Sequence, residues 1–185
     1  LYYKDADNLL VPVMRYIPKE DLGLAKAAVK GIIYSPELAE NMKPTGLFPT
    51  LPQGTSINGA VIKEDGLAIL DFSPEFLNFD SAEGEQLGIK ALVYTLTEFP
   101  NIKSVEIRVD GKQIDEMPHG TKIVGALKRS EINLVKAENK GDKLSKVMVY
   151  YQKKGSGNYT YFAPLTKLVS GYTNSAEAAL NVLLE

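Results

Sequence analysis

Residues 66–100 read GLAILDFSPEFLNFDSAEGEQLGIKALVYTLTEFP, and this stretch decides the fold. Residues 67–72 are apolar enough to predict a strand that is buried on both faces. Residues 102–109, which follow the stretch, alternate between apolar and polar side chains and predict a second strand. A long helical pattern separates the two strands. The sequence therefore predicts a β-α-β core, around which the rest of the chain packs.

The helix between these strands has start and stop signals of its own. Asp80 and Ser81 are candidate caps, and Glu83 follows Asp80 at the spacing of a capping box. Glu83 and Glu85 place negative charge at the positive end of the helix dipole. Pro100 is expected to end the helix, because its ring and missing N–H do not fit a helix interior.

Shorter elements are expected on both sides of the core. They are strands at residues 1–3, 9–17, 56–62 and 112–114, and helices at residues 22–33 and 37–42. Glu20 or Asp21 is the expected cap of the first helix. Gly66 and the pair Asp110-Gly111 suit tight hairpin turns, which need positive φ angles. The fold class predicted is α+β, a small mixed or antiparallel sheet with helices packed on one face.

The end of the chain repeats its beginning. Residues 147–151 match residues 1–3 as a tyrosine-containing strand, and residues 176–184 match residues 25–33 in apolar character. The polar composition around residues 139–143 indicates a domain boundary. We therefore predict a tandem repeat with a first domain at 1–134, a linker at 135–144 and the N-terminal part of a second, incomplete copy at 145–185.

Composition narrows the function classes. The chain has 185 residues, 44% hydrophobic and 24% charged, which is typical of a globular protein. It has no cysteine, so disulfides and thiolate metal sites are excluded. The net charge of −2 argues against a nucleic-acid partner. Residues 1–134 carry 14 Lys and Arg against 19 Asp and Glu, whereas residues 135–185 carry 7 against 4. Opposite charge on the two segments favours their docking.

Catalytic patterns are weak throughout. His119 is the only histidine, and a Ser-His-Asp triad would have to combine it with Ser73 and with Asp71 or Asp110. Nothing around Ser73 resembles a nucleophile elbow, and His119 sits in a Pro-His-Gly turn. A role as a turn residue is the stronger interpretation of His119.

Paired carboxylates for glycan cleavage could be drawn from Asp71, Glu75, Glu83 and Glu85. The structural alternative is favoured, because Asp71 and Ser73 can accept hydrogen bonds from loop amides and the two later glutamates begin a helix. We therefore expect no catalytic residues.

Ligand-binding loops are equally weak. Asp5-Ala6-Asp7-Asn8 begins like a calcium loop, but Leu10 and Tyr16 stand where such a loop needs Gly and Glu. Gln53-Gly54-Thr55 and Val109-Asp110-Gly111 lack the repeated glycines of phosphate-binding loops. We expect no cofactor and no metal site.

A tyrosine-rich hairpin remains as a possible binding surface. Tyr150, Tyr151, Tyr159 and Tyr161 flank the loop at residues 153–158 and could stack on a sugar or a base. Cross-strand packing of tyrosines in a hairpin explains the pattern equally well. Both interpretations stay open at this stage.

The order of several short motifs resembles the GerMN domain family of bacterial sporulation and germination proteins. The motifs are Leu51-Pro52-Gln53-Gly54-Thr55, Leu70-Asp71-Phe72-Ser73, Glu85, Leu92-Val93-Tyr94-Thr95-Leu96-Thr97 and Val109-Asp110-Gly111. The tyrosine-containing first strand and its spacing to Pro18 add to the likeness. The resemblance covers residues 1–134, and residues 145–185 as the start of a second copy.

The resemblance implies a non-enzymatic assembly module. It implies a lipoprotein, anchored through a cysteine that precedes Leu1, in the space between mother cell and forespore of a spore-forming bacterium. Its partners would be envelope proteins of the transenvelope secretion complex, with weak self-association, and its domains would be similar to ring-building motifs. The alternative function is binding of cell-wall peptidoglycan through the tyrosine-rich hairpin.

Overall fold

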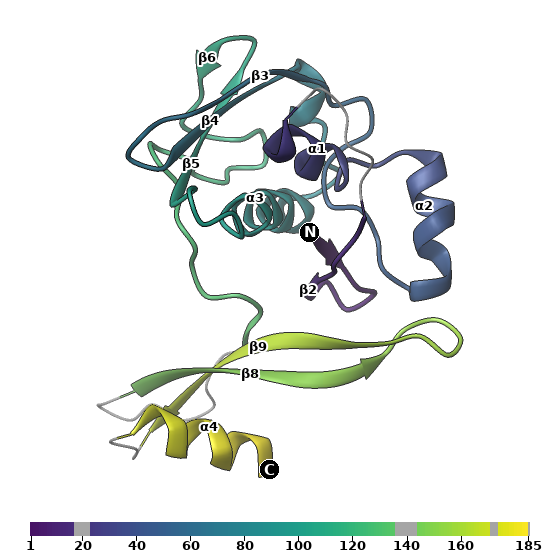
Figure 1. The fold of residues 1–185 in the computed structure, drawn as a ribbon, viewed down its shortest axis with the longest axis vertical. Helices are drawn as coiled ribbons and strands as arrows, with labels where there is room; N and C mark the ends of the chain where they lie inside the picture. The colour runs from purple at the N-terminus through teal and green to yellow at the C-terminus, as the bar shows by residue number, and fades with distance from the viewer. Residues whose placement is uncertain (17–22, 136–143, 171–173, 185) are drawn as a thin grey trace.

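The computed structural model describes residues 1–16, 23–135, 144–170 and 174–184. The chain folds as an α+β protein with helices packed against small sheets (Figure 1). A four-stranded sheet has the order β3 (Ile57–Ile62), β4 (Leu67–Phe72), β5 (Ser104–Val109) and β6 (Lys112–Gln113). β4 and β5 are parallel and are joined through α3 (Ala82–Leu96), so the predicted β-α-β core is confirmed.

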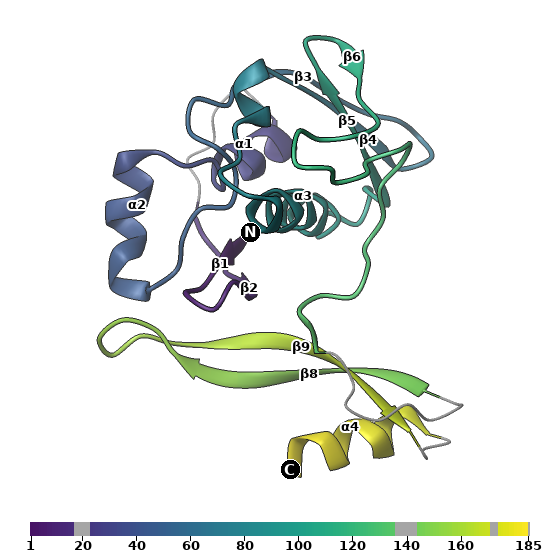
Figure 2. The same cartoon turned by 180° about the vertical axis from the view of Figure 1, so that it is seen from behind.

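The two faces of the sheet are covered unequally. Along β4 the side chains of Ala68, Leu70 and Phe72 are buried, whereas the alternate residues, Ile69 among them, are half-buried. The prediction that this strand is buried on both faces was therefore wrong. Figures 1 and 2 show α1 (Leu24–Lys30) and α3 on the covered face of the sheet. The opposite face is partly exposed over β3 and β4: Val61, which pairs with Ile69, is 59% exposed, and Ile69 is half-buried.

The capping of α3 confirms Ser81 as a predicted cap, but not the capping box of Asp80 and Glu83. Ser81 is the N-cap, and its Oγ accepts a hydrogen bond from the N–H of Gly84 at 3.1 Å. Because the helix begins one residue later than the Asp80 capping box requires, Gly84 occupies the position predicted for Glu83. The helix ends at Leu96, before Pro100, with Thr97 as its C-cap.

The predicted elements around the core are present, but the second strand and the first helix are shorter than predicted. β1 (Tyr2–Lys4) and β2 (Leu10–Pro12) form the first hairpin, and α2 (Pro36–Met42) follows α1. Short 3-10 turns occupy Lys43–Thr45 and Pro74–Leu77. Glu20 and Asp21, the expected caps of α1, lie outside the described residues.

The predicted hairpin turns are confirmed by their backbone angles. Gly66, in the β3–β4 turn, has φ = 91°. Asp110 and Gly111, in the β5–β6 turn, have φ = 48° and φ = 74°, which is the pair of positive angles that a type I′ turn needs. Both hairpin turns of the sheet therefore have the backbone angles that their residues favour.

The last segment is a second hairpin with a helix. β8 (Leu144–Lys154) pairs antiparallel with β9 (Thr160–Ser170), and α4 (Ser175–Leu184) packs on the ribbon. A short strand, β7 (Leu134–Val135), pairs parallel with β9. Hairpin followed by helix is also the order of β1, β2 and α1, so both copies begin with the same topology.

The two copies share one interaction in detail. The hydroxyl of Tyr3 donates a hydrogen bond to the carbonyl oxygen of Gly31 at 2.7 Å. The hydroxyl of Tyr151 donates to the carbonyl oxygen of Val182 at 2.8 Å, and these are the residues that the sequence repeat aligns with Tyr3 and Gly31. A lysine, Lys167, lies over the ring of Tyr151 at 5.5 Å. The repeat therefore preserves the way each hairpin holds its helix.

The helices of the two copies differ in what covers them. Val29 and Ile32 of the first copy are buried in the main core. The residues that the repeat aligns with them, Leu180 and Leu183 of α4, are exposed.

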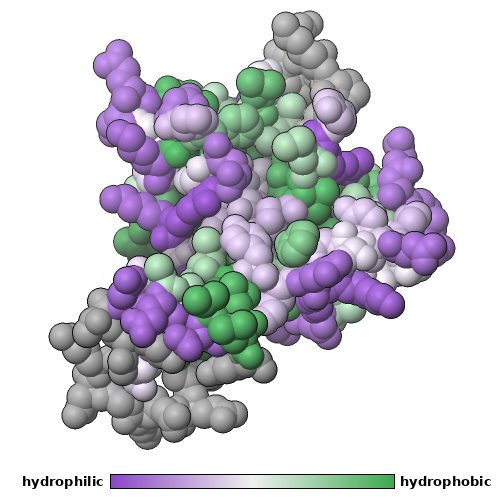
Figure 3. All heavy atoms as spheres, turned by 60° about the horizontal axis from the view of Figure 1, so that its bottom comes forward, coloured by the Kyte–Doolittle hydropathy of each residue, from purple (hydrophilic) through white to green (hydrophobic). Residues whose placement is uncertain are grey.

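The face of the molecule turned forward in Figure 3 carries separate hydrophobic patches divided by hydrophilic side chains. None of the helices within the described ranges has the length and apolar character of a membrane span.

Candidate interaction surfaces

Three of the four residues considered for a catalytic triad, Asp71, Ser73 and His119, each contact the backbone of a different loop. Asp71 Oδ1 accepts a hydrogen bond from the N–H of Gly111 at 2.7 Å, and Ser73 Oγ accepts one from the N–H of Ser56 at 3.0 Å. His119 Nε2 lies 2.7 Å from the carbonyl oxygen of Phe79. Each of these side chains is occupied with backbone groups, so the geometry assigns them to loop structure.

Glu85 is the one acidic residue of the predicted set that is fully buried. Its carboxylate accepts hydrogen bonds from the N–H of His119 at 2.8 Å and from the N–H of Thr121 at 3.0 Å. Burial alone raises the pKa of Glu85, but the hydrogen bonds from Thr121 and His119 outweigh it and lower the pKa. Glu85 therefore fastens the loop after β6 to α3, a role that its place in the first helical turn did not indicate.

The two aspartates of the weak calcium pattern at residues 5–8 bind a lysine side chain. Lys153 Nζ lies 2.6 Å from Asp5 Oδ2 and 2.6 Å from Asp7 Oδ2. Tyr161 donates a further hydrogen bond to Asp5 at 3.0 Å, and the Asp5 side chain is almost completely buried. Lys153 and Tyr161 belong to the second hairpin, so this cluster fastens the two copies together. Within the described residues, no group of three or more acidic or histidine side chains is placed to hold a metal ion.

Asn133 fastens the copies at a second point. Its side-chain amide donates to the carbonyl oxygens of Leu10 and Pro164 at 2.8 and 2.7 Å, and its Oδ1 accepts from the N–H of Leu10 at 2.8 Å. The side chain thus pairs with β2 as a strand would and bonds to β9 as well. Asn133 has φ = 47°, a conformation that asparagine tolerates better than most residues. No local pattern in the sequence indicated this role.

The tyrosines of the second hairpin do not form one exposed platform. Tyr161 is buried against Asp5, and Tyr151 is half-buried and bonded to the end of α4. Tyr150 and Tyr159 are exposed on the hairpin. The four tyrosines therefore do not form one stacking surface, because Tyr161 contacts the first copy and Tyr151 contacts α4. Cross-strand pairing of tyrosines is not seen either, since Tyr150 lies opposite Pro164 and Tyr151 opposite Ala163.

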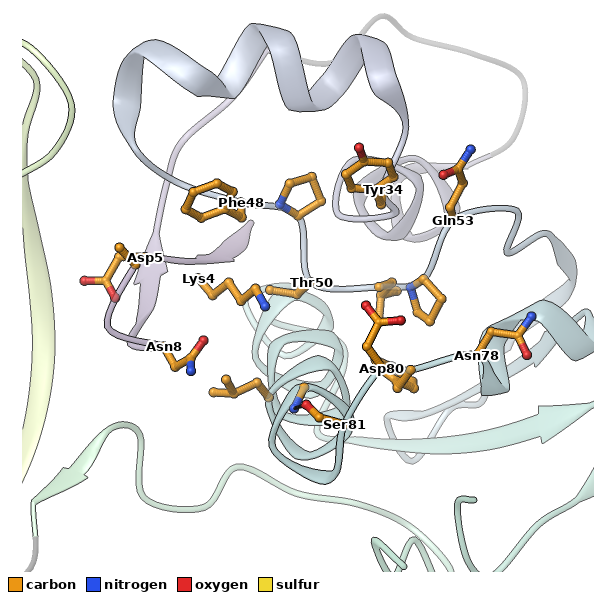
Figure 4. Close-up of a pocket in the computed structure, with 17 residues that line it drawn as sticks. Lys4, Asp5, Asn8, Tyr34, Phe48, Thr50, Gln53, Asn78, Asp80 and Ser81 are labelled. Carbon is orange, nitrogen blue, oxygen red and sulfur yellow. Dashed lines mark hydrogen bonds between the residues drawn. The ribbon is translucent and has the colours of Figure 1, made fainter. Parts of the chain in front are cut away.

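A hollow of about 870 Å³ opens at the start of α3; we call it the α3 hollow. The β1–β2 turn, the loop at residues 48–53, residues 78–81 and the first turns of α3 line it. Figure 4 shows Phe48 and Tyr34 along one side, Asp80 and Ser81 across from them, and Lys4 with Thr50 between. From the sequence, the lining residues Asp5, Gln53 and Asp80 were considered only as loop, turn or cap residues, and no pattern brought them together.

The two larger sheets have unequal free edges. β3 pairs with β4 on one side, and in the described part of the chain nothing pairs with its other side. Residues 56–62 read SINGAVI, without a charged residue, and the Val61 side chain is 59% exposed. The free edge of β8 carries Lys146, Lys153 and Lys154 instead. Charged residues on an edge strand discourage pairing with another chain, so β3 is the edge left open to it.

Comparison with known proteins places the chain in a family. Residues 1–115 match the model of the Germane family, described as sporulation and spore germination. The chain belongs to this family. It is 34% identical over 187 residues to the spore germination protein GerM of Bacillus subtilis, which covers 99% of the chain. The chain spans about half (50%) of the length of that curated relative.

Solved structures of GerMN domains agree with the fold. The tandem GerMN domains of the B. subtilis sporulation protein GerM match with a TM-score of 0.83 and 33% identity, covering 98% of this chain and 64% of that one. The first GerMN domain of the same protein matches with a TM-score of 0.63 and 36% identity, covering 70% of this chain and 95% of that one. The recognition of the GerMN family and the α+β fold class are therefore confirmed.

Proposed function

We propose that this GerMN protein is a non-enzymatic assembly module, in which the free edge of β3 pairs with an extended segment of an envelope protein. Its setting in this proposal is the transenvelope secretion complex between mother cell and forespore, where it stabilises the complex and so contributes to spores that can germinate. A lipid anchor outside this chain holds it at the outer face of the cell membrane. Its family and its likeness to tandem GerMN domains support this setting.

The observation that carries the proposal is the chemistry of the β3 edge. A strand edge presents unpaired N–H and C=O groups, and natural proteins usually protect it with charge, proline or a covering element. Residues 56–62 contain neither charge nor proline, and beyond the register shift between Ile57 and Gly59 the strand pairs regularly with β4 from Gly59 to Ile62. An extended partner segment would satisfy these backbone groups and contact the exposed side chain of Val61, which is how strand addition generates affinity and specificity.

The hydrogen-bonded connection of the two copies supports an assembly role. Asp5, Lys153, Tyr161 and Asn133 connect the second hairpin to the first domain through hydrogen bonds between side chains and to the backbone. A module connected in this way presents its edges at fixed positions relative to one another, which lowers the ordering cost of binding. Weak self-association is part of the proposal, because the same edge is available on a second copy of the chain.

The experiment is a charge placed on the open edge. Val61→Lys in the full-length protein keeps an exposed side chain and is expected to change the free energy of unfolding by no more than about 0.5 kcal/mol. Co-purification of envelope proteins from sporulating cells should be lost, and heat-resistant spores should decrease. Val61→Thr, which keeps β-branching without charge, is the matched control and should behave as the parent protein. Normal recovery of partners and spores with Val61→Lys would contradict the proposal.

A further inference from the structure

The α3 hollow combines two exposed aromatic rings in a fixed arrangement. Tyr34 is 40% exposed and Phe48 is 47% exposed. Phe48 forms a pair of backbone hydrogen bonds with Lys4, at 2.8 and 3.0 Å, and the N–H of Tyr34 donates to the carbonyl oxygen of Leu51 at 2.9 Å. Both rings therefore stand on backbone that is held in place before any ligand arrives, which reduces the cost of binding.

Polar side chains around the same hollow are free to bond a ligand. Asn8, Gln53, Asn78 and Asp80 line it, and none of their side chains makes a hydrogen bond or ion pair with another described residue. Three of the four are amides, each of which offers donors and an acceptor. Asp80 adds a carboxylate, which accepts from hydroxyl or amide groups.

We propose that the α3 hollow binds an oligosaccharide that carries N-acetyl groups. The apolar faces of sugar rings would lie against Tyr34 and Phe48, since aromatic rings supply flat apolar area at small entropic cost. The side-chain amides of Asn8, Gln53 and Asn78 complement the C=O and N–H of acetamido groups. The hollow, at about 870 Å³, lies within the size of about 300–1,000 Å³ that is usual for small-ligand sites.

The hollow is built for binding and not for cleavage. Glycoside hydrolysis needs two carboxyl groups on either side of the bond that breaks. Asp5 also lines the hollow, but its carboxylate is engaged by Lys153 and Tyr161. Asp80 is the one carboxylate in the described lining that is left without a partner. A bound sugar chain would therefore be held without being hydrolysed.

This site is distinct from the β3 edge of the proposed function. The hollow is formed by the first hairpin, the loop before β3 and the start of α3, and no residue of β3 lines it. The two proposals therefore fail separately. Loss of partners in Val61→Lys tests the edge, and sugar binding tests the hollow.

The experiment is titration of the purified protein with tetra-N-acetylchitotetraose, followed by ¹⁵N–¹H NMR, with cellotetraose as the comparison without acetamido groups. Shift changes are expected at the residues of the hollow, with at least tenfold weaker binding of cellotetraose. Tyr34→Ala and Asn78→Ala should each weaken binding by about fivefold or more. Asn78 is exposed, so Asn78→Ala removes a polar contact with the sugar without disturbing the core. This variant keeps the test valid if the aromatic variant Tyr34→Ala loses stability. Tyr150→Ala, an exposed tyrosine outside the hollow, should bind as the parent protein does.

Three results would overturn the proposal. The first is the absence of any shift change at about 10 mM sugar, which corresponds to a negligible affinity. The second is shift changes confined to the second hairpin. The third is equal binding of both sugars. Loss of binding in Tyr150→Ala as strongly as in Tyr34→Ala would also overturn it.

Discussion

Replacing Lys153 with methionine removes one partner of a buried carboxylate and tests how firmly the two copies are joined. Asp5 accepts hydrogen bonds from Lys153, from Tyr161 at 3.0 Å and from the N–H groups of Asp7 and Leu9, both at 2.9 Å. The Lys153 side chain is 25% exposed and that of Asp5 only 1%. Breaking a fully buried ion pair costs about 3–5 kcal/mol. Because water reaches Lys153 in part, we expect the lower end, about 3 kcal/mol.

The assay is urea unfolding followed by circular dichroism, on the parent protein, Lys153→Met and Lys154→Met. Lys154 is the next residue, is exposed and has no ion pair with another described residue, so its replacement should change the free energy of unfolding by less than about 0.5 kcal/mol. Equal stability of the two variants would refute the reasoning that the Asp5 cluster joins the copies.

The same cluster predicts a dependence on pH. Burial alone raises the pKa of Asp5, but hydrogen bonds from Lys153, Leu9 and Tyr161 outweigh it and lower the pKa. A carboxyl with a lowered pKa stabilises the folded state above its unfolded pKa of about 3.9 and loses that contribution as the pH falls through its folded pKa. The parent protein should therefore lose more stability than Lys153→Met on acidification below about pH 4.

Three further changes have defined outcomes. Glu85→Ala leaves two loop N–H groups without their acceptor and should lower the free energy of unfolding, measured in urea, by about 2 kcal/mol. Glu83→Ala, at an exposed position, should not lower it. Equal losses in the two variants would contradict the role of Glu85. Asn133→Gly keeps the positive φ but removes the bridge, so hydrogen exchange at the Leu10 amide should become at least tenfold faster, and unchanged exchange would refute the bridge. Burial raises the pKa of Tyr161 to about 12, so the stability that it contributes is present below about pH 10 and is lost as the pH rises towards 12; Tyr161→Phe should flatten that alkaline loss, measured as Tm against pH.

Much of the fold could be predicted from local patterns. The β-α-β core follows from apolar periodicity, and the turns at Gly66 and Asp110-Gly111 follow from the residues that tolerate positive φ. The repeat could be found because residues 147–151 resemble residues 1–3, and residues 176–184 match residues 25–33 in apolar character. The strands, the helix and the turns depend on residues close together in the sequence, and the repeat is found by comparing two stretches of it, so the sequence alone reveals both.

The failures share a physical cause. Whether Ile69 is covered depends on which helices reach each face of the sheet, and a single strand does not encode that. Asn133 bonds to Leu10, a residue far away along the chain, and Asp5 bonds to Lys153 across the two copies. The α3 hollow likewise joins four separate segments. Contacts at long range in the sequence were therefore the part that periodicity and motifs did not predict.

The placement of a photo-crosslinker at Val61 tests most directly whether the β3 edge is the contact surface. The full-length protein with p-benzoylphenylalanine at position 61 would be irradiated in sporulating cells, with the same probe at the exposed positions Lys154 and Tyr150 for comparison. If the β3 edge is the contact surface, covalent adducts with an envelope protein, or with a second copy, form from position 61 and not from the other two. Adducts from the hairpin positions and none from position 61 would contradict it.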